Sequence, residues 1–121
     1  MSAHRSDRMA ESIRRMMPEL LRGIKDPRVS QMLSVVRVEA SSDLSRARIF
    51  VSALEGAEQS RRSVEGLKSA GGMLRHEISR SLGLKKAPML EFIADDSIAH
   101  SAKIADMLKD LNPGESDSNN E

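Results

Sequence analysis

The chain has 121 residues, a net charge of +1 and no cysteine. Its length suits one domain with a core of its own, and the lack of cysteine excludes disulfides and thiolate metal sites. No apolar run approaches the roughly 18 residues of a membrane span and the N-terminus carries no signal-peptide core, so we expect a cytoplasmic protein without a membrane partner.

A helix is predicted first, from about Arg5 to Gly23. Arg8, Arg15 and Arg22 lie seven residues apart and share one face of it. Pro18 removes a hydrogen bond inside this helix, so we expect a kink there, the alternative being two short helices. Apolar residues recur on another face at spacings of three and four, widened by Met17 and Leu21: Met9, Ile13, Met16, Leu20 and Ile24.

Two strands are predicted after the turn signal Asp26-Pro27, over Leu33–Ala40 and Ala47–Leu54. Apolar residues alternate with other residues along the second strand, which is the period of a half-buried strand. The segment Ser41-Ser42-Asp43 between the strands is typical of a turn, so the pair is predicted to form an antiparallel hairpin.

A long helical pattern then runs from Ala57 to Leu82 and is interrupted at Gly71-Gly72. Each glycine costs a helix interior about 0.5–1 kcal/mol relative to alanine, so the pair should bend or break the helix. The glycines could serve close packing of the helix on the sheet, expose backbone for binding, or do both.

The chain ends with a third predicted strand, Met89–Ala94, and a last helix, Ser97–Leu111, that has an apolar side. Asp95 and Asp96 are interpreted as capping residues of that helix rather than as Mg²⁺ ligands. Residues 112–121 are polar and acidic, so we expect a disordered tail beyond a single domain of residues 1–111.

Catalysis is not indicated by any residue pattern. His4, His76 and His100 lie on separate elements without metal-ligand spacing, and the chain has no phosphate loop, nucleophile elbow or dinucleotide fingerprint. We therefore expect no enzyme, no metal, no cofactor and no small-molecule substrate.

Charge points instead to a polyanion. Residues 1–90 hold 17 Lys and Arg against 10 Asp and Glu, whereas residues 91–121 hold 2 against 8. A basic body favours a nucleic-acid partner, although a pattern that serves only solubility fits these charges equally well. Proteins that read single-stranded RNA usually stack bases on aromatic rings, but Phe50 and Phe92 lie in strand-like runs and are predicted to be core. Recognition by shape and phosphate contact suits the chain better.

The predicted order is helix, strand, strand, helix-break-helix, strand, helix, an α+β arrangement in which helices pack on a three-stranded sheet. This is the order of a type II KH domain, an RNA-binding fold that clamps the RNA backbone in a GXXG loop. No two glycines of this chain are three residues apart, so that clamp is absent and Ala70-Gly71-Gly72 takes its place.

Basic residues gather around this break, and we predict that the region contacts RNA phosphates. The candidate RNA-binding residues are Lys68, Ala70, Gly71, Gly72, Arg75, His76, Arg80, Lys85 and Lys86, with Arg8, Arg15 and Arg22 as a second contact.

Four stretches carry a family resemblance that spans residues 5–111: residues 24–28; Val38, Asp43-Leu44, Ala47 and Val51-Ser52; Leu67, Ala70-x-Gly72 and Leu74-Arg75; and Leu84, Pro88, Leu90, Phe92 and Asp95 to Ile98. In this combination and spacing the chain resembles bacterial ribosome-binding factor A, a KH-like family in which an Ala-x-Gly kink replaces the GXXG loop. Pro18 and the short acidic tail depart from the family pattern.

The resemblance implies a factor that binds the free, immature 30S subunit through 16S rRNA or its precursor. It implies assistance in late maturation, including processing of the rRNA 5′ end, a role in cold adaptation, and release once the subunit is mature. Nothing in the sequence demands more than a monomer. Two other functions stay open: a protein-interaction module acting through the acidic C-terminal helix, and a DNA-binding regulator.

Overall fold

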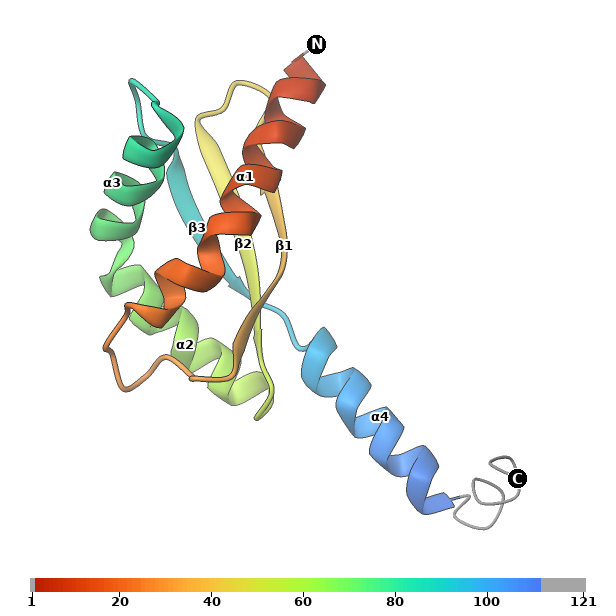
Figure 1. Ribbon diagram of the computed structural model, residues 1–121. Helices are drawn as coiled ribbons and strands as arrows, with labels where there is room; N and C mark the ends of the chain where they lie inside the picture. Colours follow the sequence, from red (N-terminus) through yellow and green to blue (C-terminus); the bar gives the residue numbers. More distant parts are fainter. Residues whose placement is uncertain (1, 112–121) are drawn as a thin grey trace.

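The fold consists of four helices and a three-stranded sheet, seen in a computed structural model that describes residues 2–111, without the side chains of residues 2–4, 99, 110 and 111. The predicted tail, residues 112–121, lies outside the described residues. In chain order the elements are α1 (Ser2–Arg22), β1 (Leu33–Ala40), β2 (Arg46–Ala53), α2 (Ala57–Ser69), α3 (Gly71–Leu82), β3 (Met89–Ala94) and α4 (Ser97–Leu111) (Figure 1). The predicted α+β order of a type II KH domain is confirmed.

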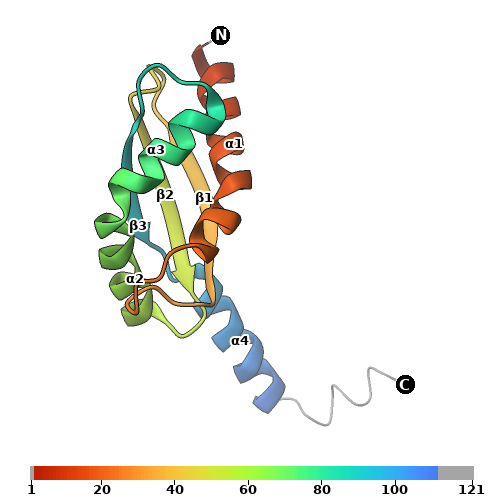
Figure 2. The same ribbon diagram turned by 60° about the vertical axis from the view of Figure 1, so that its left-hand side comes forward.

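The sheet has the order β1-β2-β3. Strand β1 pairs antiparallel with β2, and β2 pairs parallel with β3. The parallel pairing is possible because α2 and α3 form a crossover between the two strands. Figures 1 and 2 show α1, α2 and α3 on one face of the sheet, whereas α4 leaves the domain beyond the end of β3.

The core lies between these three helices and the sheet. The predicted inward face of β2 is confirmed, because Ala47, Ile49, Val51 and Ala53 are fully buried under the helices, but Phe50 and Ser52 on the other face are buried too, so the strand is not half-buried. The helices contribute the rest of the cluster, together with one aromatic residue from β3: Met9, Ile13, Met17, Val64, Leu67, Leu74, Ile78 and Phe92.

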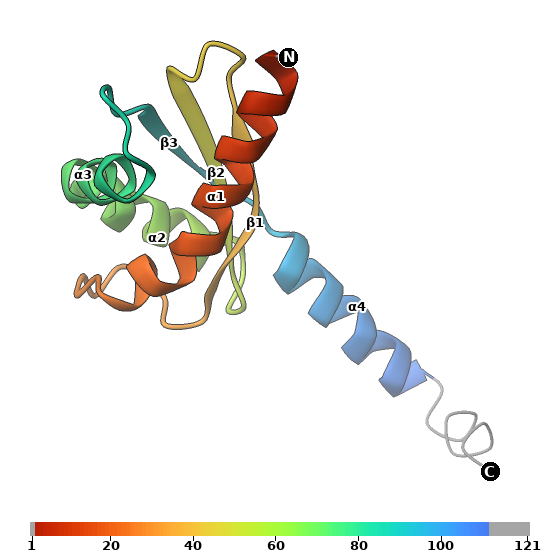
Figure 3. The ribbon, with the colours of Figure 1, turned by 45° about the horizontal axis from the view of Figure 1, so that its top comes forward.

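Helix α1 continues through Pro18 as one helix, so the alternative of two short helices is wrong. Its axis bends in its last third (Figures 1 and 3), where the proline removes a backbone donor. Met17 is fully buried, whereas Met16 and Leu20 are half-buried beside it. The buried residues of α1, Met9, Ile13 and Met17, thus form a narrower stripe than the apolar face predicted from the sequence.

The opposite face of the sheet holds Phe50. Both phenylalanines are buried, as expected, but only Phe92 belongs to the helix-covered cluster. The Arg37 guanidinium carbon lies 3.8 Å from the centroid of the Phe50 ring, a cation–π contact. The register shifts between Val35 and Arg37, so Val36 is an extra residue in β1.

Small residues let α2 pack closely on its neighbours. Ser60 Oγ accepts a hydrogen bond from Ala53 N at 2.8 Å, and Ser63 Oγ accepts one from Ser30 N at 3.0 Å. A Cβ atom on Gly66 would lie only 2.6 Å from Val29 Cγ2. The hydrogen bond to Ser63 and the absence of a side chain at Gly66 therefore hold α2 close to the loop that follows α1.

Helix α4 is the least packed element. Its apolar side was predicted, but Ile98, Ile104, Met107 and Leu108 are 38–55% exposed. Over the described part of the chain, no helix combines the length and the apolar character that a membrane crossing requires.

Gly66→Ala should destabilise the protein, because the new methyl group would force Val29 or α2 to move. Overpacking typically costs about 1–3 kcal/mol, of which alanine's better helix propensity offsets up to about 1 kcal/mol. Urea denaturation measures the difference. Gly72→Ala is the matched control, since a Cβ atom there meets nothing within 4 Å, and it should leave stability unchanged or raise it slightly. Equal stability of the two variants would contradict the close approach.

Candidate RNA-binding surface

The break between α2 and α3 is a single residue. Ala70, with φ −89° and ψ 4°, ends one helix and begins the next. Its N–H donates to the carbonyl oxygens of Gly66 and Leu67 at 3.2 and 3.1 Å, and its own carbonyl accepts from Leu74 N at 3.0 Å. The carbonyl oxygen of Lys68 accepts another backbone N–H of this cap, so α2 already satisfies part of the donors at the break. No side chain caps the start of α3. Backbone N–H groups in the first turn of a helix lack carbonyl partners within it, and such a turn is suited to bind an anion.

Gly71 and Gly72 sit in this first turn without a packing reason to be glycine. Neither has a positive φ, and a Cβ atom on either would meet nothing within 4 Å. Close packing of the helix on the sheet, one of the roles considered from the sequence, is therefore not their role; the glycine that permits close packing is Gly66, and it faces Val29 in the loop after α1. The two glycines leave open space directly over the first turn of α3.

The loop after α1 brings further charge to the break, which the site prediction missed. Arg28 Nη2 donates to Ser69 Oγ at 3.0 Å and so ties this loop to the last residue of α2. Lys25 lies in the same loop, is exposed and has no ion pair among the described residues. The stretch of residues 24–28 was already a signal of the family resemblance, but only the fold shows that it lies beside the break.

Asp26 holds Arg28 in place. Arg28 donates from Nε and Nη2 to the two carboxylate oxygens at 3.0 and 2.7 Å, and from its backbone N at 2.9 Å. These hydrogen bonds, first those from the guanidinium, lower the pKa of Asp26 to about 2. The carboxylate is thus ionised and occupied at neutral pH, and it orients the Arg28 guanidinium toward α2.

Arg75 has a structural contact where an RNA contact was predicted. Its Nε donates to the carbonyl of Pro88 at 2.9 Å, and its Nη2 donates to the carbonyl of Ala87 at 3.1 Å. The half-buried guanidinium therefore fixes the end of the loop of residues 83–88, which carries Lys85 and Lys86.

Four other predicted cations are already paired with carboxylates one turn away on the same helix: Arg15 with Glu11 at 3.1 Å, Arg22 with Glu19 at 3.3 Å, Lys68 with Glu65 at 3.3 Å and Arg80 with Glu77 at 2.8 Å. His76 is exposed on α3. Exposed pairs of this kind are weak, so these side chains can still exchange their partners for phosphates.

The structure does not bring all the predicted residues together. Lys68, Ala70, Gly71 and Gly72 lie at the break, whereas Lys85 and Lys86 follow the other end of α3. The stripe of Arg8, Arg15 and Arg22 extends over about 21 Å of α1 at 1.5 Å per residue, so no single phosphate can contact all three arginines.

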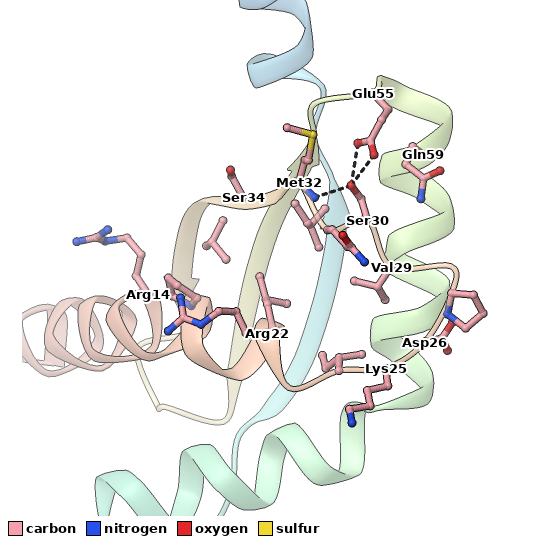
Figure 4. A pocket seen from close by; sticks show the side chains of 17 residues that line it. Arg14, Arg22, Lys25, Asp26, Val29, Ser30, Met32, Ser34, Glu55 and Gln59 are labelled. Carbon is pink, nitrogen blue, oxygen red and sulfur yellow. Dashed lines mark hydrogen bonds between the residues drawn. The ribbon is translucent and has the colours of Figure 1, made fainter.

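An open groove of about 1290 Å³ lies between α1, the loop after it and the start of α2. Figure 4 shows Arg14 and Arg22 on one side of it and Glu55 on another. Ser30 Oγ lies 2.8 and 2.9 Å from the two Glu55 oxygens. The carboxylate makes this groove less suited to a polyanion than the break.

Among the described residues, no cluster of His, Cys, Asp and Glu has the form of a metal site.

The chain is similar to known proteins over most of its length. The model of the family "Ribosome-binding factor A" matches residues 5–108. Ribosome-binding factor A of Caldanaerobacter subterraneus subsp. tengcongensis is 40% identical over 117 residues, which cover 96% of each chain. A Thermotoga maritima solution structure described as a ribosome binding factor A has a TM-score of 0.70 at 33% identity, with 79% of this chain and 92% of that chain covered. A Thermus thermophilus ribosome binding factor A, placed as a homology model in the cryo-EM map of a 30S complex, has a TM-score of 0.58 at 26% identity and coverages of 69% and 88%.

Arg75→Ala should lower the free energy of unfolding by about 1–3 kcal/mol, because two carbonyl groups lose a charged donor. Urea denaturation measures this loss. Arg61→Ala is the control, since Arg61 is exposed on α2, and a surface change of this kind stays within about 0.5 kcal/mol. If both variants have wild-type stability, Arg75 does not hold the loop.

Asp26→Asn should reduce stability at neutral pH but not at very low pH. A carboxyl whose pKa is about 2 in the folded protein, against about 3.9 when unfolded, stabilises the fold above pH 4 and loses this effect as the pH falls toward 2. Thermal unfolding between pH 7 and pH 2 should therefore show the stabilities of wild type and variant converging. A difference that stays constant with pH would contradict the role of the ionised Asp26.

Proposed function

The chain belongs to the ribosome-binding factor A family, and from this premise we propose that it binds the immature 30S subunit by gripping phosphates of folded 16S rRNA, or of its precursor, at the α2–α3 break. The observation that carries the proposal is the pair Gly71 and Gly72. Their first turn is uncapped by any side chain and open to solvent, and neither backbone geometry nor packing explains the glycines.

A phosphate at this turn would accept hydrogen bonds from backbone N–H groups and sit at the positive end of the α3 dipole. Three cations lie near the site: Lys25 has no ion pair among the described residues, whereas Arg28 and Lys68 are paired with Asp26 and Glu65. Such contacts read phosphate position and not base identity, which suits recognition of a folded RNA by its shape. Affinity should fall steeply as the salt concentration rises.

The family extends the proposal beyond binding. We propose a non-catalytic factor that acts in the cytoplasm as a monomer without a cofactor, assists late maturation including processing of the rRNA 5′ end, contributes to cold adaptation, and leaves once the subunit is mature. The relative placed in a 30S complex supports the choice of the small subunit as partner.

A second function, binding of a protein partner through α4, is favoured by one observation. Ile104, Met107 and Leu108 are 43%, 52% and 55% exposed on a helix that protrudes from the domain (Figure 3). Association through this apolar side would depend little on salt, whereas phosphate contacts depend on it strongly.

The cellular test is a sucrose gradient of a lysate. We expect the protein to sediment with free small subunits and not with whole ribosomes. A uniform distribution, or none on ribosomal particles, would overturn the proposed function.

Replacing Gly71 and Gly72 together by alanine should weaken co-sedimentation with purified 30S subunits by roughly ten-fold, about 1.4 kcal/mol of binding free energy. The two methyl groups would occupy the space over the first turn while leaving the fold intact. Gly23→Ala is the matched control, because its Cβ atom makes an ordinary contact 3.5 Å from the Leu20 oxygen. Wild-type affinity of the double variant, with circular dichroism confirming its fold, would exclude the break as the binding site.

A further inference from the structure

The basic side chains of this protein differ in whether they already have a partner. Within residues 5–109, where side chains are described, eight form ion pairs and Arg75 donates to carbonyl groups. The cations without such a partner there are Arg5, Arg8, Lys25, Arg46, Arg61, Arg62, Lys85, Lys86, Lys103 and Lys109. Unpaired, exposed cations are the ones that can neutralise a phosphate without first giving up a carboxylate.

Half of these unpaired cations come from three segments that meet at one end of the domain. The N-terminal end of α1, the loop between β1 and β2 with the first residue of β2, and the loop between α3 and β3 lie at this end in Figures 1, 2 and 3. We call the group the basic pole: Arg5, Arg8, Arg46, Lys85 and Lys86, all of them exposed. The same segments contain two acids, Asp7 and Asp43, so five positive charges against two leave a balance of +3.

The two acids at this end offset only part of the charge of the basic pole, and neither forms an ion pair with one of its cations among the described residues. Asp43 accepts hydrogen bonds from the hydroxyls of Ser41 and Ser45 at 2.8 and 2.7 Å, and from Ser45 N at 3.1 Å. Its carboxylate is therefore engaged in shaping its own turn. Asp7 is exposed and forms no ion pair with a described residue.

Internal stability does not explain the cations of the basic pole. Arg5 and Arg8 lie in the first two turns of α1, which has no acidic residue in its first turn, although the helix dipole favours anions at that end. Lys85 and Lys86 place two like charges side by side. Arg75 fixes the end of their loop through the carbonyls of Ala87 and Pro88, so the lysines project from an anchored loop.

We propose that the basic pole is a second phosphate-binding surface, which contacts an RNA segment separate from the one held at the α2–α3 break. The proposal rests on the proposed function and adds a second point of contact to it. Helix α3 has 12 residues and separates the two surfaces by about 18 Å at 1.5 Å per residue. A single bound phosphate cannot serve both.

Two contacts on one rigid domain act together. Once the break has bound one RNA segment, binding at the basic pole becomes intramolecular, and two weak contacts give a tight complex only when both segments are correctly placed. The protein would then distinguish an rRNA fold in which the segments have this spacing from one in which either segment has moved.

The test compares two paired substitutions with a matched control in binding to purified bacterial 30S subunits over a series of KCl concentrations. Lys85→Ala with Lys86→Ala, and Arg5→Ala with Arg8→Ala, should each weaken binding roughly 3- to 30-fold and lower the salt slope by about 2. Lys103→Ala with Lys109→Ala removes the same charge from exposed positions on α4 and should leave the slope unchanged. Thermal unfolding checks that each variant is folded.

Each other result has a definite meaning. An equal loss of binding in the α4 control would show an effect of net charge alone and would overturn the proposal that the basic pole binds RNA. Wild-type binding of both pole variants, together with weak binding of the Gly71 and Gly72 double variant, would overturn the pole and leave the proposed function standing. No binding by the wild type would overturn both. Weaker binding to 30S subunits but not to protein-free 16S rRNA would assign the pole to a ribosomal protein and also overturn it.

Discussion

The close approach of α2 to the loop after α1 determines the geometry of the rest of the domain. Gly66 permits it, because any Cβ atom there would overlap Val29 Cγ2. Ser63 then accepts the backbone N–H of Ser30, and Arg28 reaches Ser69 at the end of the helix. With α2 held at both its middle and its end, Ala70 must begin α3 at a fixed place above the sheet, and the open glycine turn is presented in one orientation.

Periodic patterns in the sequence predicted the elements well, because each pattern reflects burial on one face. The alternation in β2, the apolar spacing in α1 and the double glycine at the start of α3 all have direct structural counterparts. Contacts between distant residues could not be predicted in this way. The buried serines of α2 resemble solvent-facing residues in the sequence, and only their partners, seven and 33 residues away, explain their burial. The burial of Phe50 on the second face of the sheet has a similar cause, since Arg37 on the neighbouring strand covers its ring.

In the candidate site, too, contacts between residues close in the sequence were predictable, whereas contacts between distant residues were not. Ion pairs such as Glu77 with Arg80 could be predicted from their spacing of three residues. The sequence therefore already indicated that several of the predicted RNA-binding cations have a carboxylate partner. The role of Arg75 was not readable, because its acceptors are backbone carbonyls 12 and 13 residues further on. Lys25 and Arg28 became site residues only when the fold placed their loop beside the break.

The extra residue in β1 affects how readily copies of this protein aggregate. β1 is an edge strand, and an unpaired strand edge is a template for aggregation with another chain. At Val36 the row of backbone groups falls out of register, and the charged side chains of Arg37 and Glu39 follow. An incoming strand would therefore lose its ladder of hydrogen bonds after the first few residues, which keeps this edge resistant to the stacking that leads to fibres.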